Sequence, residues 1–234
     1  MRIHRVHLPT LQEGEVVLTG SEAHHLARVL RVNVGQEIKA FDGAGLESTG
    51  VVQSVHDFQV ILELQEPRAS DVEASLKITL AIALLKGDKL ADVVRQATEL
   101  GVVAIQPLIT KYCDVKELSA NKLERLRRVA QEASKQSGRS VVPEVREAVK
   151  LREVQIPLLS ILAHPHTSSS LNDVALGKGS PLTIFTGPEG GFAEEEIKFL
   201  MSKGVTPVRL GARILRAETA PVALIAALLL PEAL

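Results

Sequence analysis

The chain has 234 residues, and its 27 basic and 28 acidic side chains give a formal net charge of −1. Apolar residues make up 45% and charged residues 24%, which is typical of a globular protein and excludes a disordered chain. The near-neutral balance argues against a protein that coats nucleic acid indiscriminately through a basic surface. The single cysteine, Cys113, excludes an internal disulfide, and the N-terminus lacks the apolar run of a signal peptide. We therefore expect a soluble cytoplasmic protein.

The first 66 or so residues favour short strands around one helix. The expected strands cover 15–18, 36–41, 46–55 and 59–64. A helix is expected over 21–31, where Leu26, Val29 and Leu30 have helical spacing. Turn signals occur at 42–45 and at His56-Asp57. Short strands at close spacing predict a small β-barrel, followed by a linker over 67–71.

From Leu76 onward, strands and helices alternate. The expected strands cover 76–84, 102–109, 158–163, 182–186 and 205–210, and the expected helices cover 88–100, 119–136, 193–202 and 217–230. This alternation predicts an α/β fold with a mainly parallel sheet covered by helices. The apolar tract 222–230 has about half the ~20 residues that a membrane span needs, so we expect a buried C-terminal helix. The sequence thus predicts two domains, 1–70 and 71–234.

Three strand ends carry unusual sequences, and ligands bind beyond the carboxyl ends of strands in open α/β sheets. The segments are His164-Pro165-His166, Gly187-Pro188-Glu189-Gly190-Gly191-Phe192 and Gly211-Ala212-Arg213-Ile214-Leu215-Arg216. The glycines allow close approach of the backbone to a ligand, although a plain tight turn is the alternative. The acidic run 194–196 after the second segment disfavours phosphate, so a neutral or cationic ligand fits better. Arg213 and Arg216 are either functional or ordinary surface arginines.

Basic residues gather locally. Residues 120–152 hold nine basic and four acidic side chains, a balance of +5, which indicates either phosphate contacts or a solvated helix face. Residues 1–70 have a balance of −3, but arginines cluster near their helix and N-terminus. The four histidines in the first 25 residues match no zinc signature, and Cys113 has no activating neighbour. We expect no metal and an inert cysteine.

Six segments, taken together, resemble one family. They are His25–Arg31, Phe41–Gly43, Gln96–Val102, Glu132–Arg139, Gly187–Phe192 and Leu210–Ala220. They span nearly the whole chain and resemble the RsmE family of bacterial 16S ribosomal RNA (uracil-N3)-methyltransferases, in the SPOUT superfamily. One minor departure is Ala217, where a less compact residue often stands.

The resemblance implies a PUA-like β-barrel RNA-binding domain over 1–70 and a SPOUT methyltransferase domain over 71–234. The second domain would contain a trefoil knot in its parallel sheet. The implied cofactor is S-adenosyl-L-methionine, and the implied partners are 16S rRNA of the small ribosomal subunit and a second copy in a homodimer, without membrane or metal. The implied cofactor-binding residues are Leu162, Ala163, His164, Thr186, Gly187, Pro188, Glu189, Gly190, Gly191, Leu210, Gly211, Ile214, Leu215 and Arg216.

The chemistry of the implied reaction suggests the catalytic residues. N3 of neutral uracil carries a proton, so an arginine would stabilise the developing anion and a carboxylate would accept the proton. The candidates are Arg139 and Arg216 for the first role and Glu218 for the second. The candidate RNA-binding residues are Arg2, Arg5, Arg28, Arg31 and Arg139.

Three other functions stay open at this stage. The chain could be an RNA-binding module without catalysis. It could be a SPOUT enzyme that methylates a ribose 2′-hydroxyl or another base. Without the resemblance, a generic nucleotide-binding α/β enzyme also fits, although no phosphate-binding motif occurs.

Overall fold

The contacts within the chain divide it into two units, which are described separately. The computed structural model describes residues 3–56, 59–174 and 181–229. The first unit comprises Met1–Glu73 and Ser134–Val142, and the second comprises Ala74–Ala133 and Pro143–Leu234. Arg2 and part of the expected turn at His56-Asp57 lie outside the described residues.

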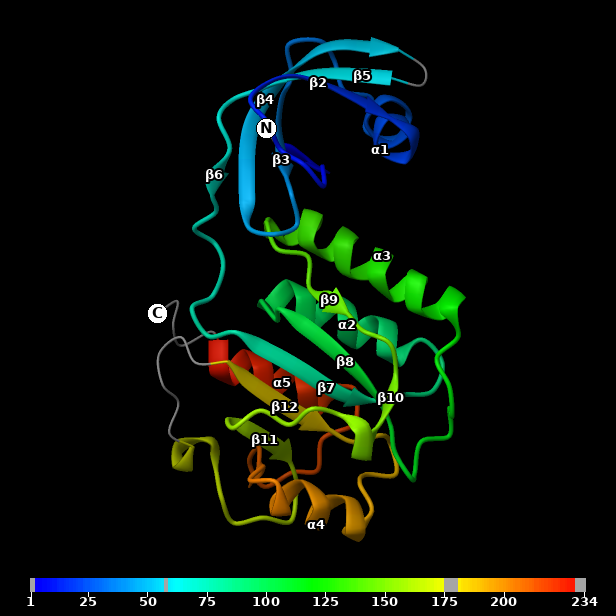
Figure 1. The fold of residues 1–234 in the computed structure, drawn as a ribbon, viewed down its shortest axis with the longest axis vertical. Coiled ribbons are helices and arrows are strands. Elements are labelled where there is room, and N and C mark those ends of the chain that lie inside the picture. The colour runs from blue at the N-terminus through cyan, green and yellow to red at the C-terminus, as the bar shows by residue number, and fades with distance from the viewer. Residues whose placement is uncertain (1–2, 57–58, 175–180, 230–234) are drawn as a thin grey trace. The chain divides into compact units, whose positions relative to one another are not determined.

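A mixed sheet forms the body of the first unit (Figure 1). Its strands are β1 (His4–His7), β2 (Gly14–Thr19), β3 (Glu37–Phe41), β4 (Leu46–His56), β5 (Gln59–Leu64) and β6 (Arg68–Ala69). The order is β1-β3-β4-β5-β2, and β6 pairs with β4. β1 and β3 are parallel, whereas the other pairs are antiparallel. The four strands expected from the sequence are confirmed.

The core of this sheet follows the alternation of its strands. Val60, Leu62 and Leu64 of β5 are buried, while the residues between them are more exposed. The helical segment consists of α1 (Gly20–His24) and a π-helical turn (His25–Val29), and Leu26 from this turn is buried in the same core. The predicted helix is therefore confirmed, with a π-helical second half that its apolar spacing alone did not indicate.

A buried ion pair joins the two segments of the first unit, Met1–Glu73 and Ser134–Val142. The Arg139 guanidinium donates to Glu73 through Nε at 3.1 Å and Nη2 at 2.7 Å. The same carboxylate accepts from the backbone N–H groups of Ser140 at 3.2 Å and Val141 at 3.0 Å. Arg5 adds bonds to the Arg139 carbonyl and the Ser140 hydroxyl. These charges satisfy one another inside the unit, so they hold the chain in place.

The second unit contains a parallel sheet and most of the helices. Its strands are β7 (Ile78–Ala83), β8 (Ala104–Ile109), β9 (Glu144–Val145), β10 (Val149–Lys150), β11 (Ser160–Ala163), β12 (Leu182–Thr186) and β13 (Thr206–Val208). Its helices are α2 (Lys89–Leu100), α3 (Ala120–Ser137), α4 (Glu194–Ser202) and α5 (Thr219–Leu229), and the last four residues of α3 belong to the first unit. Short 3₁₀ turns cover Leu151–Glu153 and Leu171–Asp173.

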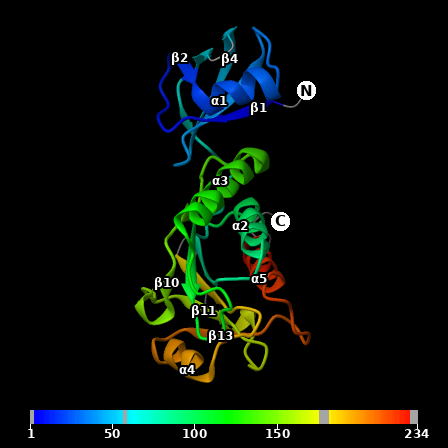
Figure 2. The same cartoon turned by 90° about the vertical axis from the view of Figure 1, so that its right-hand side faces the viewer.

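All pairs in this second sheet are parallel, in the order β10-β8-β7-β12-β11-β13, with β9 beside β8. Figure 1 and Figure 2 show α2 and α5 side by side against the sheet. The central strands β7 and β12 are buried along nearly their whole length, as is typical of parallel strands covered on both faces. The predicted parallel α/β sheet is confirmed.

Four short strands were not expected from the sequence. β1 contains two histidines and an arginine, and only Val6 in it is fully buried, so its alternation is weak. β6 lies inside the expected linker 67–71, where two exposed residues pair with β4. β9 and β10 have two residues each, too few to show a period. In the described ranges, no helix is both long enough and apolar enough to cross a bilayer.

Candidate active site

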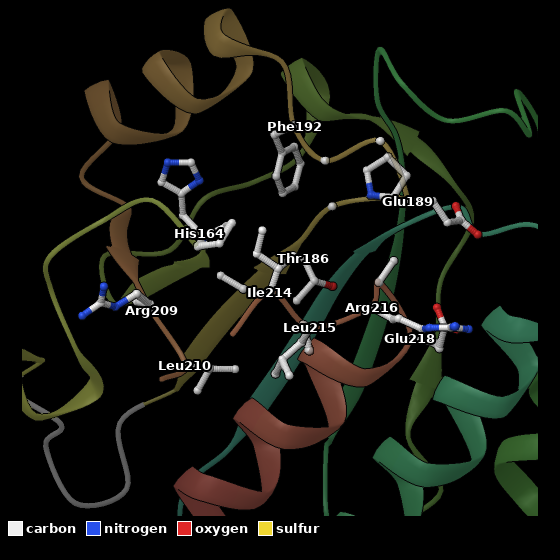
Figure 3. Close-up of a pocket in the computed structure, with 18 of the residues that line it drawn as sticks. His164, Thr186, Glu189, Phe192, Arg209, Leu210, Ile214, Leu215, Arg216 and Glu218 are labelled. Carbon is white, nitrogen blue, oxygen red and sulfur yellow. The ribbon is translucent and has the colours of Figure 1, made fainter. Parts of the chain in front are cut away.

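Three loops that leave neighbouring strands line one pocket of about 590 Å³ (Figure 3). They follow β11 at His164, β12 at Gly187 and β13 at Arg209. Because β11 pairs with both β12 and β13 in parallel, these carboxyl ends meet at one edge of the sheet. The volume is in the range of pockets that hold a small organic ligand.

Two glycines of the loop after β12 have little room for a side chain. A Cβ on Gly190 would lie 2.9 Å from the Cβ of Tyr112, and a Cβ on Gly187 would lie 3.1 Å from the Phe192 ring. Gly191 has a φ of +71° and donates its N–H to the Pro188 carbonyl, which closes a tight turn. The wall at this point is therefore main chain, with peptide groups in place of side chains.

Polar groups that are available to hydrogen-bond a ligand lie among apolar side chains in the pocket. The Thr186 hydroxyl is buried and has no hydrogen-bond partner within the described structure. The backbone N–H groups of residues 210–215 likewise donate to no backbone carbonyl of the described chain. Leu210, Ile214 and Leu215 supply apolar surface beside them (Figure 3). Such a lining suits a flat heteroaromatic ring that needs apolar faces and main-chain donors at its edge.

A charged network borders the pocket where α2 and α5 begin. Lys89 Nζ lies 3.2 Å from Glu189 Oε1 and 3.3 Å from Glu218 Oε2. The pKa of Lys89 is raised chiefly by its hydrogen bond to Glu189, and then by the neighbouring Glu218 carboxylate. A bond from its own backbone N–H, and next the Lys89 ammonium, lower the pKa of Glu218. Hydrogen bonds from backbone N–H groups and from Lys89 also lower the pKa of Glu189, against the opposing effect of burial, so all three groups are charged at neutral pH.

Arg216 is the most accessible charge of this network. Its side chain is 83% exposed, and its Nη1 lies 3.9 Å from Glu218 Oε1. Figure 3 shows Arg216 and Glu218 close together next to the start of α5. A guanidinium held loosely at the pocket rim is free to meet an incoming anionic group.

His164 adds no charge of its own to the opposite wall of the pocket, where Arg209 also lies (Figure 3). Burial, and then the neighbouring His166, lower the pKa of His164 below the usual imidazole value. The two rings meet edge to face, with their centroids 5.8 Å apart. His164 is therefore neutral at pH 7, which avoids repulsion of a cationic ligand.

The structure brings most of the expected cofactor-binding residues together. Those that line the pocket are Ala163, His164, Thr186, Gly187, Pro188, Glu189, Gly190, Leu210, Ile214, Leu215, Arg216 and Gly191. Leu162 does not line it, because its side chain is buried in the core of the sheet. Gly211 also does not line it, although it lies within the loop after β13. Of the expected catalytic residues, Arg216 and Glu218 line the pocket.

The expected RNA-binding arginines fall into two groups. Arg28 and Arg31 are exposed at the end of the helical segment of the first unit, and Arg31 has a φ of +51°. Arg5 and Arg139 have side chains only 11% and 5% exposed and are held by Glu47 and Glu73. Arg139 is also absent from the pocket lining, because its guanidinium is bound within the first unit.

Sequence reasoning missed Lys89, the residue that links the two pocket carboxylates. It follows the predicted strand 76–84 by only a few residues, so it emerges at the same sheet edge as the three loops. This position, a few residues after a predicted strand, is the sequence feature that could have identified Lys89 as a pocket residue. Among the described residues, no group of His, Cys, Asp and Glu has the arrangement of a metal site.

Comparisons with known proteins identify the same family across nearly the whole chain. The family described as "RNA methyltransferase domain" matches residues 72–229, and the "RNA methyltransferase PUA domain" matches residues 18–65. A Synechocystis protein named ribosomal RNA small subunit methyltransferase E is 37% identical over 89% of this chain and 71% of its own length. The Bacillus subtilis protein of that name is 34% identical over 87% of this chain and 85% of its own.

A solved structure shares the fold. The ribosomal RNA small subunit methyltransferase E of Neisseria gonorrhoeae, crystallised with S-adenosyl methionine, superimposes with a TM-score of 0.90. It is 33% identical, and the match covers 97% of both chains. The predicted fold class, a SPOUT-type knotted parallel-sheet domain preceded by a PUA-like domain, is thereby confirmed. The chain belongs to the ribosomal RNA small subunit methyltransferase E family.

Proposed function

We propose that this protein transfers a methyl group from S-adenosyl-L-methionine to N3 of a specific uridine in 16S rRNA of the small ribosomal subunit. The observation that carries the proposal is the pocket at the carboxyl ends of β11, β12 and β13, with its main-chain walls and apolar side chains. The chain that forms this pocket is similar along 97% of its length to a relative crystallised with the same cofactor.

The residues of the pocket fit the proposed cofactor in three ways. The buried Thr186 hydroxyl lacks a partner and is available to a ligand. Leu210, Ile214 and Leu215 provide apolar contacts for an adenine ring. The neutral His164 does not repel a sulfonium cation, and the Glu189 carboxylate in the lining supplies negative charge. When bound, S-adenosyl-L-methionine supplies an electrophilic methyl group.

The chain's own residues position the base and stabilise its charge. Loss of the N3 proton leaves a negative charge that is shared between N3 and the ring oxygens. That charge is consumed when N3 accepts the methyl group, and the electrons of the broken bond between the methyl carbon and sulfur would remain with the departing thioether. The exposed Arg216 guanidinium is the group we assign to that charge, because it lies at the pocket rim and is held only loosely. It favours release of the N3 proton to solvent water by stabilising the anion that remains.

Glu218 serves mainly to position its neighbours. Its lowered pKa makes it a weaker base than an ordinary carboxylate, so it is poorly suited to remove the N3 proton. Its two oxygens face Lys89 and Arg216 instead, at 3.3 and 3.9 Å. We therefore assign to Glu218 the orientation of Arg216, with Lys89 and Glu189 as support.

RNA recognition is assigned to the domain over 1–70 and methyl transfer to the domain over 71–234. Arg28 and Arg31 are the candidates for phosphate contacts, because both are exposed. A cytoplasmic homodimer is the expected form, following the family resemblance. Light scattering after size-exclusion chromatography tests this, since a monomer at assay concentration would contradict it.

Methyl transfer to isolated ribosomal subunits tests the proposed function. Small and large subunits from a strain that lacks the modification are incubated separately with the protein and S-adenosyl-L-methionine labelled in its methyl group. Label should enter 16S rRNA and not the large-subunit RNA. Binding of the cofactor without any transfer to RNA would instead support an RNA-binding protein without catalysis.

A further inference from the structure

Tyr112 places an exposed aromatic ring next to the candidate active site. The chain has one tyrosine, five phenylalanines and no tryptophan. Tyr112 is 46% exposed, whereas each phenylalanine that the structure describes is buried or half-buried. Among the described Phe and Tyr rings, Tyr112 is thus the one with a large exposed surface. Lys111 Nζ lies over one face of this ring, 5.6 Å from its centroid, so the opposite face is the one open to a base.

This ring is presented by a turn with fixed geometry, just after β8. The backbone N–H of Lys111 donates to Glu196 Oε1 at 2.8 Å, and Lys111 Nζ lies 2.7 Å from Glu195 Oε1. The N–H of Cys113 donates to the Thr110 carbonyl at 3.3 Å, which closes the turn. Tyr112 is therefore held between residues that are anchored at the start of α4, the helix that follows the glycine-rich loop.

Tyr112 also contacts the loop that lines the pocket. A Cβ on Gly190 would meet the Tyr112 Cβ at 2.9 Å and its Cγ at 3.6 Å, so the two residues lie in direct contact. Because β8 is parallel to β7 and β7 to β12, the turn after β8 and the loop after β12 emerge at the same edge of the sheet. Tyr112 does not itself line the pocket, but it stands at the same sheet edge, against the loop that does.

The proposed reaction requires such a surface. N3 lies on the Watson–Crick edge of uracil, so the base must leave its pair and its stack before it can be methylated. Proteins stabilise unstacked RNA bases by stacking them on aromatic side chains. We propose that Tyr112 is the residue on which the target uracil stacks, an inference that rests on the proposed function.

The contrary explanation is that the ring only covers Gly190. In that case any large apolar side chain would replace it. If the ring stacks a base, only another aromatic side chain would replace it. Tyr112→Phe and Tyr112→Leu therefore separate the two explanations, because both keep an apolar cover and only the first keeps a π face.

Steady-state methylation of small ribosomal subunits is the decisive test. Tyr112→Phe should stay within about twofold of the wild type, whereas Tyr112→Leu should lower kcat/KM for the subunit by about tenfold or more, as expected for one lost stacking contact. Calorimetric binding of S-adenosyl-L-methionine should be unchanged in both. Met201→Ala, which alters another half-exposed apolar side chain of the second unit, is the matched control and should behave as the wild type.

The outcomes separate this proposal from the proposed function. If the wild type labels 16S rRNA and Tyr112→Leu does so equally well, Tyr112 is not the stacking residue. If the wild type transfers no methyl group to RNA, both proposals fall.

The single tyrosine also allows a direct optical measurement, since tyrosine emission comes from Tyr112 alone. A bound single-stranded oligouridylate should quench that emission, whereas an abasic oligomer of the same length should not. Unchanged emission at saturation with the oligouridylate, verified by the anisotropy of a labelled copy, would overturn the stacking role.

Discussion

Replacement of Arg139 by alanine separates a structural from a catalytic role for this residue. Its side chain is 5% exposed and that of Glu73 is 11% exposed, so the substitution leaves a carboxylate buried without its cation. Removal of one partner from a buried pair costs about 3–5 kcal/mol. We expect the lower value, about 3 kcal/mol, because Glu73 still accepts from the N–H groups of Ser140 and Val141.

This loss should appear as a shift in thermal unfolding. For a domain of the size of the first unit, 1 kcal/mol corresponds to at least about 4 °C, so Tm of its transition should fall by about 12 °C. Circular dichroism measures the transition. Arg146→Ala is the matched control, because the pair of Arg146 with Glu144 is exposed and should contribute under about 1 kcal/mol.

A methylation assay of Arg139→Ala at a temperature below its lowered Tm completes this experiment. If Arg139 is structural, the variant should still methylate small subunits at a temperature where it is folded. An unchanged Tm combined with abolished methylation would refute this reasoning and indicate a catalytic role for Arg139.

Three further predictions concern the pocket. Thr186→Val should weaken S-adenosyl-L-methionine binding by about fivefold, the equivalent of about 1 kcal/mol. It should not lower Tm, because the buried hydroxyl has no partner within the protein to lose, and a lower Tm by calorimetry would contradict this. Arg216→Ala should reduce methylation by about a hundredfold while cofactor binding survives. Arg95→Ala on the exposed face of α2 is the control, and equal losses of cofactor binding and of methylation rate in Arg216→Ala would rule out a catalytic role for Arg216. Cofactor affinity should be constant at pH values well above the lowered pKa of His164 and should fall as the pH drops through that pKa, since the imidazolium then repels the sulfonium. His164→Asn should flatten this profile, and a pH dependence that persists in the variant would assign it to another group.

The sequence predicted the framework of the site because its signals are local. Continuous apolar runs such as 76–84 and 182–186 indicated buried parallel strands, and β7 and β12 confirm them. Glycines and prolines directly after such strands indicated the loops that line the pocket. Each of these signals lies within about ten residues of the chain.

Long-range partners could not be predicted in this way. Glu73 and Arg139 are 66 residues apart, and nothing near either residue indicates the other. An arginine in a basic stretch was therefore interpreted as a candidate for RNA contact or catalysis, although its guanidinium lies inside the first unit. The position of Tyr112 against Gly190 is equally non-local, because it depends on the order of β8, β7 and β12 in the sheet.

The most direct test of the account is the chemical identity of the methylated product. Small ribosomal subunits that lack the modification are treated with the protein and S-adenosyl-L-methionine, and their 16S rRNA is digested to nucleosides for mass spectrometry. The account predicts 3-methyluridine, present after treatment with the wild type and strongly reduced with Arg216→Ala. A 2′-O-methylated nucleoside, a methyl group on another base, or no methylated product would contradict it.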